Sequence, residues 1–338
     1  MDKRPPLPKK PNKPKTRKAE KLLPDISSVN RNPPVIIKEQ QFGHGKNIVM
    51  GISSSHLCIA TGRSGVQLYD LTTMKEDGLV TCYESKVTTL FAVSDSKIWA
   101  GSSEGHLFLL DLKKKLVIDK KFKAHSGSVK FISRFRETLL SCDDEGNLII
   151  WSNIESFEKK QFIKVLQKPV GICDCGSDGI WATSSKNLQI IRPDFSSSHM
   201  IEVSAILLNS GTITDMENCN LTNNIFLSFD DGNVAIWDTK SQTLLSVYNI
   251  SYYKILKMIL IGEKFLWITN TTRKIIVIDI SDSCNWIVKK EWEASSQCIS
   301  NFSVLDSKED TFVASSSTEG LVSIWSGSNG NDELGNLF

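Results

Sequence analysis

The strongest constraint on the fold is a strand-rich unit that recurs at intervals of 40 to 47 residues. Each copy has an apolar strand, a second strand that ends in a small hydroxylated residue, a turn containing Gly, Asp, Glu or Asn, and a third strand that ends in a large apolar residue. The residues that end the third strands are Tyr69, Leu110, Trp151, Ile191, Trp237, Ile278 and Trp325. The chain is therefore organised as copies of one module.

This module has the length of a propeller blade. The runs are short, apolar or alternating, and almost none keeps the periodicity of a helix, so strands dominate. A repeat of about 40 to 45 residues with four strands per copy is the signature of a β-propeller. Seven copies fit between residues 34 and 326. The sequence predicts an all-β, seven-bladed β-propeller over 34–326.

The two ends of the repeat region indicate how the ring is closed. The segment after Trp325, SGSNGNDELGNLF, contains no strand, so the last blade lacks its fourth strand. PVIIKEQQF, residues 34–42, precedes the first complete copy and has the pattern of a strand. Because an unpaired edge would leave the ring open, we predict that residues 34–42 complete blade 7. Residues 327–338 are expected to be a flexible tail.

Residues 1–33 differ from the remainder in composition. They hold ten Lys or Arg against three Asp or Glu, a net charge of +7, so the other residues carry −5 of the overall +2. Seven of the ten prolines also lie there. Such a segment buries too little apolar surface to offset the entropy that ordering costs. The sequence predicts a disordered, basic, proline-rich N-terminal tail over 1–33.

The tail contains one short recognition pattern, RPPLPKK. Pro5, Pro8 and Lys10 stand in the P-x-x-P-x-K arrangement, which a polyproline II helix presents on one side to a Src-homology-3 domain. Two alternatives stay open: a tail that is only solvated, and a tail that contacts an anionic membrane surface or nucleic acid. No aromatic residue is interleaved with the lysines, so no specific nucleic acid is expected as a partner.

Some third strands and one loop carry a more specific pattern. A large aromatic residue is followed by Asp in GVQLYDL and GNVAIWD, and a histidine precedes a repeat in KAHSGSV. In these features the sequence resembles the WD-repeat family. The resemblance covers residues 34–326 and is strong in blades 2, 3, 5 and 7, whereas blades 4 and 6 are degenerate.

The resemblance implies a structural role for the conspicuous polar residues of FKAHSGSVKFISRFRETLLSCDDEGNLIIW. In WD repeats a histidine, a hydroxyl, a turn acid and a tryptophan form a buried hydrogen-bonded network. The matching residues are His125, Ser141, Glu145 and Trp151 in blade 3 and Ser228, Asp231 and Trp237 in blade 5. Partial copies are His44, Thr61 and Tyr69 in blade 1 and Ser295, Ser315, Glu319 and Trp325 in blade 7. Because the pattern recurs, whereas a catalytic site is built once, we favour cohesion over catalysis.

A narrower resemblance rests on three second strands and two other segments. The strands are KIWAGS around Trp99, GIWATS around Trp181 and FLWITN around Trp267. With KAHSGSV and LLPDISSVNRNPP, they are similar to the propeller region of fungal and plant inositol polyphosphate 5-phosphatases, in which a separate phosphatase domain follows. The phosphatase motifs do not occur in this chain, nor do the GxxxxGK, GxSxG or HExxH motifs.

These observations favour a non-catalytic platform that binds other proteins and needs no cofactor. It is expected to recruit or regulate an inositol polyphosphate 5-phosphatase. The alternatives are a free-standing WD-repeat scaffold of an unrelated complex, and part of a phosphatase whose catalytic domain is absent here. Turns between second and third strands share a face with the histidine loop, and their mixed charges suit a protein partner, although a solvated face is the alternative. The basic candidates on this face are Arg63, Lys86, Lys168, Lys186 and Arg273.

The cysteines and the hydropathy indicate a cytoplasmic protein. Eight cysteines lie mostly within strand-like runs without CxxC pairs, which favours free thiols in a reducing compartment. Cys173 and Cys175 alternate in GICDCG, but no second ligand pair stands near them, so no metal site is expected. No apolar run of about 18 residues occurs, and none follows the basic start. We expect a protein that is free in the cytoplasm or peripheral to membranes.

Overall fold

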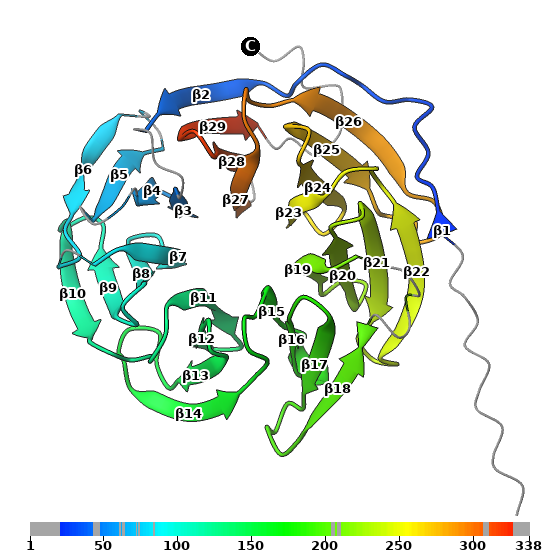
Figure 1. Cartoon of the computed structure of the whole chain (residues 1–338). Helices are drawn as coiled ribbons and strands as arrows, with labels where there is room; N and C mark the ends of the chain where they lie inside the picture. Colours follow the sequence, from blue (N-terminus) through cyan, green and yellow to red (C-terminus); the bar gives the residue numbers. More distant parts are fainter. Residues whose placement is uncertain are drawn as a thin grey trace, which may run out of the picture.

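Seven β-sheets stand around a ring in the computed structural model (Figure 1). The structure describes residues 21–42, 48–60, 62, 65–71, 73, 75–83, 85–203, 207, 211–306 and 311–326. Within each blade the strands follow the sequence from the centre of the ring outward, except that the outermost strands of blades 5 and 7 come from the N-terminal part of the chain. The predicted all-β, seven-bladed propeller is confirmed.

The strands of the first four blades run in sequence order. Blade 1 contains β3 (Val49–Ile52), β4 (His56–Ala60), β5 (Val66–Asp70) and β6 (Glu76–Val80). Blade 2 contains β7 (Val87–Ser94), β8 (Lys97–Ser102), β9 (Leu107–Asp111) and β10 (Leu116–Lys121). Blade 3 contains β11 (Val129–Phe135), β12 (Thr138–Asp143), β13 (Asn147–Trp151) and β14 (Lys159–Lys164). Blade 4 contains β15 (Gly171–Asp174), the 3-10 turn η1 (Gly176–Asp178), β16 (Ile180–Thr183), β17 (Asn187–Ile191) and β18 (Ser198–Glu202).

Blades 5 and 7 include strands from the N-terminal part of the chain. Blade 5 contains β19 (Ile213–Cys219), β20 (Asn224–Phe229), β21 (Asn233–Asp238) and β22 (Thr243–Asn249), with β1 (Lys21–Leu22) as a fifth strand. Blade 6 contains β23 (Ile255–Ile261), β24 (Phe265–Asn270), β25 (Lys274–Asp279) and β26 (Ile287–Glu293). Blade 7 contains β27 (Ile299–Asp306), β28 (Thr311–Ser317), β29 (Leu321–Ser326) and β2 (Ile36–Gln41).

The core lies between the blades. Side chains alternate along each strand, so every sheet presents one apolar set to each of its two neighbours. Each cluster of buried apolar residues accordingly draws on two adjacent blades, all round the ring. Between blades 2 and 3, for example, the rings of Trp99 and Trp151 meet edge to face with centroids 5.6 Å apart. The blades therefore stabilise one another.

The strand β2 closes the ring. It pairs antiparallel with β29, with Ile36 opposite Trp325 and Gln41 opposite Leu321. Hydrogen bonds continue past both ends, from the Phe42 amide to the carbonyl of Gly320 at 2.8 Å and beyond Ile36 to Val35. This is the place that the sequence indicated for residues 34–42. Blade 7 thus obtains its fourth strand from the opposite end of the chain.

Residues 21–33, which we call the N-terminal strap, bind the outer edges of blades 5 and 6. Lys21 pairs in parallel with Val247 of β22. The Asp25 amide donates to the carbonyl of Trp286 at 2.7 Å, and the Asn30 amide donates to the carbonyl of Lys289 at 2.9 Å. The predicted boundary of the disordered tail at residue 33 is therefore corrected. Free backbone groups on the sheet edges hold this segment, which its composition does not reveal.

Residues 1–20 and 327–338 lie outside the described residues, so the expectations for them stay predictions. Within the described part of the chain, no helix is long and apolar enough to cross a membrane.

Candidate functional site

The polar residues of blade 3 form a buried hydrogen-bonded network. His125 precedes β11, Ser141 lies in β12 and Trp151 ends β13. The Ser141 hydroxyl is 2.7 Å from Nε2 of His125, and it accepts a hydrogen bond from Nε1 of Trp151 at 2.9 Å. The side chain of His125 has no exposed surface. The network therefore joins a loop to two strands, out of contact with solvent.

The acid of this network is Asp143, and the prediction of Glu145 is wrong. Oδ2 of Asp143 lies 3.6 Å from Nδ1 of His125, and neither side chain is exposed. Glu145 is on the surface and accepts from the hydroxyl of Ser126 at 2.9 Å. Among the described residues Nδ1 of His125 makes no hydrogen bond, so the Asp143 carboxylate acts on the ring through its charge. The end of β12 supplies the acid in place of the turn.

Burial and hydrogen bonding set the protonation of this pair. Burial lowers the pKa of His125 to about 4, although the Asp143 carboxylate opposes the shift. Burial alone would raise the pKa of Asp143, but donors from Asn147 and Gly127 outweigh it and keep this pKa below its usual value. The amide and Nδ2 of Asn147 both donate to Asp143 at 2.7 Å. The network therefore contains a neutral imidazole beside a carboxylate near neutral pH.

The corresponding residues of blade 5 do not form this network. The Ser228 hydroxyl bonds to the hydroxyl of Thr214 at 2.9 Å. Among the described residues, Nε1 of Trp237 has no hydrogen-bond partner. Asp231 accepts from Asn233 and lies 3.9 Å from the Lys21 amino group of the N-terminal strap. The predicted network of Ser228, Asp231 and Trp237 is therefore corrected: Ser228 and Asp231 have separate partners, and neither bonds to Trp237.

The partial copies in blades 1 and 7 differ as well. In blade 7, Nε1 of Trp325 donates to the Ser315 hydroxyl at 2.8 Å, and the Ser295 hydroxyl donates to Glu319 at 3.2 Å. This blade thus keeps the tryptophan bond. In blade 1, His44 and Thr61 lie outside the described residues.

A second polar cluster joins blades 5 and 6 on their innermost strands. Nζ of Lys257 in β23 lies 2.8 Å from Oδ1 of Asp215 in β19, and the other oxygen of Asp215 accepts from the Met258 amide at 2.8 Å. Burial and the Asp215 carboxylate raise the pKa of neighbouring Glu217 to about 8. A carboxylate of blade 5 thus accepts a hydrogen bond from a backbone amide on the innermost strand of blade 6. No local pattern predicts this contact, because Asp215 and Lys257 are 42 positions apart in the chain.

One face of the ring, which we call the His125 face, is built from two kinds of loop. The loops that precede the innermost strands bond to the turns between second and third strands. For example, the Ser103 amide donates to the carbonyl of Lys86, and the Lys168 amide donates to the carbonyl of Asp144, both at 2.8 Å. The predicted common location of these loops therefore follows from backbone pairing.

The predicted basic residues of this face have different surroundings. Lys168 and Lys186 are exposed, and Lys86 is partly buried. Arg273 is already engaged, since it pairs with Glu293 at 2.9 Å and donates to the carbonyl of Ser296 at 3.1 Å. Arg63 lies outside the described residues, as do Pro5, Pro8 and Lys10 of the tail.

The His125 face also presents two tyrosines that sequence reasoning missed. Tyr252 and Tyr253 are 94% and 56% exposed in the loop between blades 5 and 6. The loop is fixed beside them, because the Ser251 amide donates to Gly232 and Lys254 accepts from the amide of Thr271. Exposed aromatic residues on a fixed loop are typical anchors of protein interfaces. The adjacent pair in SYYK was the available signal.

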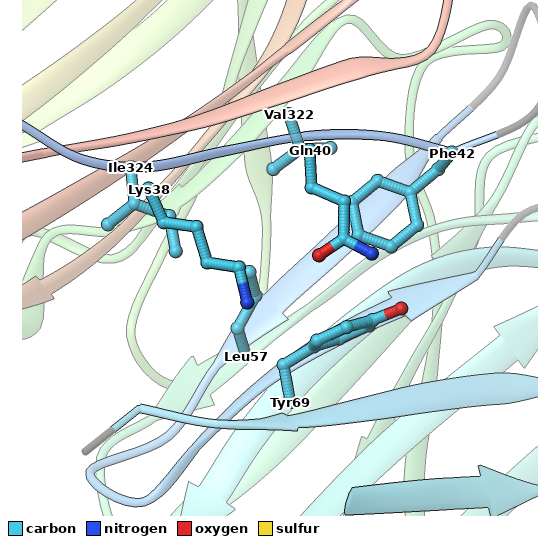
Figure 2. A pocket seen from close by; sticks show the side chains of 7 residues that line it. All are labelled: Lys38, Gln40, Phe42, Leu57, Tyr69, Val322 and Ile324. Atoms are coloured by element: carbon cyan, nitrogen blue, oxygen red, sulfur yellow. The ribbon is translucent and has the colours of Figure 1, made fainter. Parts of the chain in front are cut away.

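A small cavity at the seam of blades 7 and 1 does not have the size of a ligand site. Figure 2 shows Lys38 and Gln40 extending from β2 toward Tyr69. The Lys38 amino group lies 5.7 Å from the centroid of the Tyr69 ring, which meets Phe42 edge to face at 5.2 Å. The cavity has a volume of about 10 Å³, room for about one water molecule. These contacts fasten β2 to blade 1.

Comparisons with known proteins identify the fold. A chain in the crystal structure of the mitotic checkpoint complex matches with a TM-score of 0.70 and 11% identity, over 97% of this chain and 98% of that chain. The likeness is one of fold. No family model and no curated protein sequence matches. In the described part of the chain, no group of three or more His, Cys, Asp or Glu side chains is arranged to hold a metal ion.

Proposed function

We propose that this chain is a non-catalytic platform that binds other proteins through the His125 face. The observation that carries the proposal is the pair Tyr252 and Tyr253, which are large, exposed and held on a fixed loop. The polar residues that resemble a catalytic cluster are enclosed in blade 3 and serve cohesion. The similar chain of the mitotic checkpoint complex belongs to an assembly of several proteins, which supports a role in an assembly.

A photo-crosslinking amino acid at position 252 tests this proposal in cells. We expect discrete crosslinked partners, and we expect that Tyr253→Ala in the same protein reduces them. The same crosslinker in place of Phe162, which is 49% exposed on the outer wall of blade 3, is the matched control. Equal crosslinking from both positions would contradict the proposal, because it would show that the His125 face is not preferred.

The narrower proposal is that the platform recruits or regulates an inositol polyphosphate 5-phosphatase. It rests on the resemblance of the IWAG-type strands and the LLPDISSVNRNPP segment to that family. Phosphate release from an inositol polyphosphate by complexes captured on the chain, and not by the chain alone, would support it. Release by the purified chain would contradict the non-catalytic assignment. No release from either would favour the free-standing scaffold.

The tail has a separate role in this proposal. Pro5, Pro8 and Lys10 form the arrangement expected of a Src-homology-3 ligand, and the basic charge suits an anionic membrane surface. Binding of residues 1–20 to immobilised Src-homology-3 domains, with Pro5→Ala and Pro8→Ala as the control, distinguishes the first role from the second.

A further inference from the structure

The outer wall of blade 2 concentrates positive charge. Residues 113–123, KKKLVIDKKFK, hold six lysines and one acid, Asp119, a net charge of +5. Every residue of this segment except Val117 is exposed. We call residues 113–123 together with Tyr83 the basic wall. Its charge is opposite in sign to the −5 that residues 34–338 carry as a whole, so the wall is a local feature of the surface.

Within the part of the chain that the structure describes, most of these charges have no counterion. Lys115 pairs with Asp77 of blade 1 at 2.9 Å. Among the described residues, the other five lysines of the segment form no ion pair. They are Lys113, Lys114, Lys120, Lys121 and Lys123. The described residues thus leave an excess of positive charge on the wall, which favours the approach of an anionic partner.

Aromatic rings stand among the lysines. Tyr83 and Phe122 are 54% and 49% exposed. The Lys120 amino group lies 4.1 Å from the ring centroid of Tyr83 and 5.1 Å from that of Phe122. His106 and Phe108 support these rings, with centroids 5.1 Å from Phe122 and 6.1 Å from Tyr83 respectively. The aromatic groups form a supported platform.

The edge of β10 is available for pairing. It is the outermost strand of blade 2, and in the described residues no further strand covers it, whereas β1 covers part of β22. Lysines on an edge protect it against aggregation, but that role does not require the apolar side chains that accompany them. Leu116, Ile118 and Phe122 are 44%, 45% and 49% exposed. Charged and apolar groups thus share one free strand edge.

We propose that the basic wall binds an extended segment of a protein partner in which acidic and apolar side chains alternate. The partner's carboxylates lie against Lys120, Lys121 and Lys123, and its apolar side chains cover Tyr83 and Phe122. Its backbone pairs with β10, which spans about 20 Å. A membrane surface fits the wall less well. The rings of Tyr83 and Phe122 pack against each other and do not project separately, as side chains that insert into a membrane do.

The test uses the full chain and a capped, fluorescent peptide of about ten residues in which Asp and Tyr alternate. The variant Lys120→Glu, Lys121→Glu, Lys123→Glu is expected to weaken binding at least about tenfold. A matched control is Lys159→Glu, Lys160→Glu on β14 of blade 3, which should change affinity less than about twofold. Raising the ionic strength from about 0.05 M to about 0.5 M should also weaken binding. Unchanged melting temperatures show that the variants are folded.

A second variant tests whether the peptide contacts the aromatic rings of the wall as well as being attracted by its positive charge. Phe122→Ser keeps every charge and removes the exposed ring, so the proposal expects at least about threefold weaker binding of the same peptide. Equal loss in the β10 and β14 variants would overturn the proposal, as would equal binding of a peptide in which Lys replaces Asp. Wall-dependent binding of phosphatidylserine vesicles without binding of the acidic peptide would also overturn it.

Discussion

Blades 3 and 5 have closely similar sequences but are held together differently. LSCDDEGNLIIW and LSFDDGNVAIWD both contain the serine, acid and tryptophan pattern. In blade 3, Ser141 joins His125 to Trp151 inside the sheet. In blade 5, Nε1 of Trp237 has no partner among the described residues, and β1 adds a strand to the outer edge. Blade 3 thus contains a buried side-chain network, whereas blade 5 lacks it and has an added edge strand, and the repeat pattern does not predict this difference.

The largest expected effect comes from removing the external strands altogether. Deletion of residues 1–41 takes away the N-terminal strap and β2, so blade 7 loses its fourth strand and the ring its closure. We expect a loss of more than about 4 kcal/mol in the free energy of unfolding, or failure to fold. Urea unfolding measures this, with deletion of residues 1–20 as the control. Equal midpoints for the two deletions would contradict external closure.

The next effect concerns the buried imidazole of blade 3. Because the pKa of His125 is lowered to about 4, the unfolded chain binds a proton below about pH 6.5 that the folded chain excludes. The contribution of His125 to the stability of the wild type therefore falls by up to about 3 kcal/mol as pH falls from about 6.5 to about 4, and His125→Gln lacks this contribution. The stability difference between the two proteins should narrow over this window. Glu217, whose raised pKa acts in the opposite direction, is present in both and cancels.

Unfolding of both proteins at several pH values measures this difference. A constant difference from pH 7.5 to pH 4, values that bracket the about 6.5 of a free histidine, would show that His125 is not held neutral. A difference that widens as the pH falls would show that the network is an ion pair, and either outcome would require another explanation for the contrast with blade 5.

Serine substitutions compare the two blades directly. Ser141→Ala leaves Nε2 of His125 and Nε1 of Trp151 buried without their partner, which costs about 2 to 3 kcal/mol. Ser228→Ala removes only the bond to Thr214, which is partly exposed and can turn to water, so its cost is below about 1 kcal/mol. Thermal unfolding of the two variants tests this order. Equal losses would show that blade 5 relies on its serine as blade 3 does.

The smallest effect isolates the N-terminal strap. Deletion of residues 1–33 keeps β2 but removes β1 and the bonds to β26. We expect about 1 kcal/mol of destabilisation, because few apolar groups of the strap are buried. Hydrogen exchange should accelerate in β22 and β26 and stay unchanged in β14, which the strap does not touch. Uniform acceleration in all three strands would mean that the strap acts on the whole ring.

Much of the fold was predictable because its signals are local. Strand alternation, turn residues and the spacing of Tyr69, Trp151 and Trp325 indicate the blades without knowledge of distant contacts. The site was predicted in part. Ser141 and Trp151 were found from their positions in strands, but the acid was misplaced by two residues. Which of Asp143 and Glu145 faces His125 depends on how the turn after β12 is oriented, and both positions carry a carboxylate.

The N-terminal strap shows where prediction from local sequence signals fails. Its proline content and charge predicted disorder over 1–33, yet residues 21–33 bind blades 5 and 6. Leu22 and Val29 pack against the cluster between these blades, and backbone groups supply the remaining bonds. Amino-acid composition describes side chains only. The free N–H and C=O groups that bind the strap belong to sheet edges, which exist only after the sheets have formed.

The amino-acid sequence by itself determined that seven similar blades form and that a strand near residue 36 closes the last of them, because strand period and turn chemistry act over a few residues. Tertiary structure alone decided which carboxylate meets His125, that the tryptophan of blade 5 lacks the bond made in blade 3, and that Lys21 lies beside Val247. Each of these features depends on segments that come together only when the ring assembles. The assembled ring therefore determines which backbone and side-chain groups become partners.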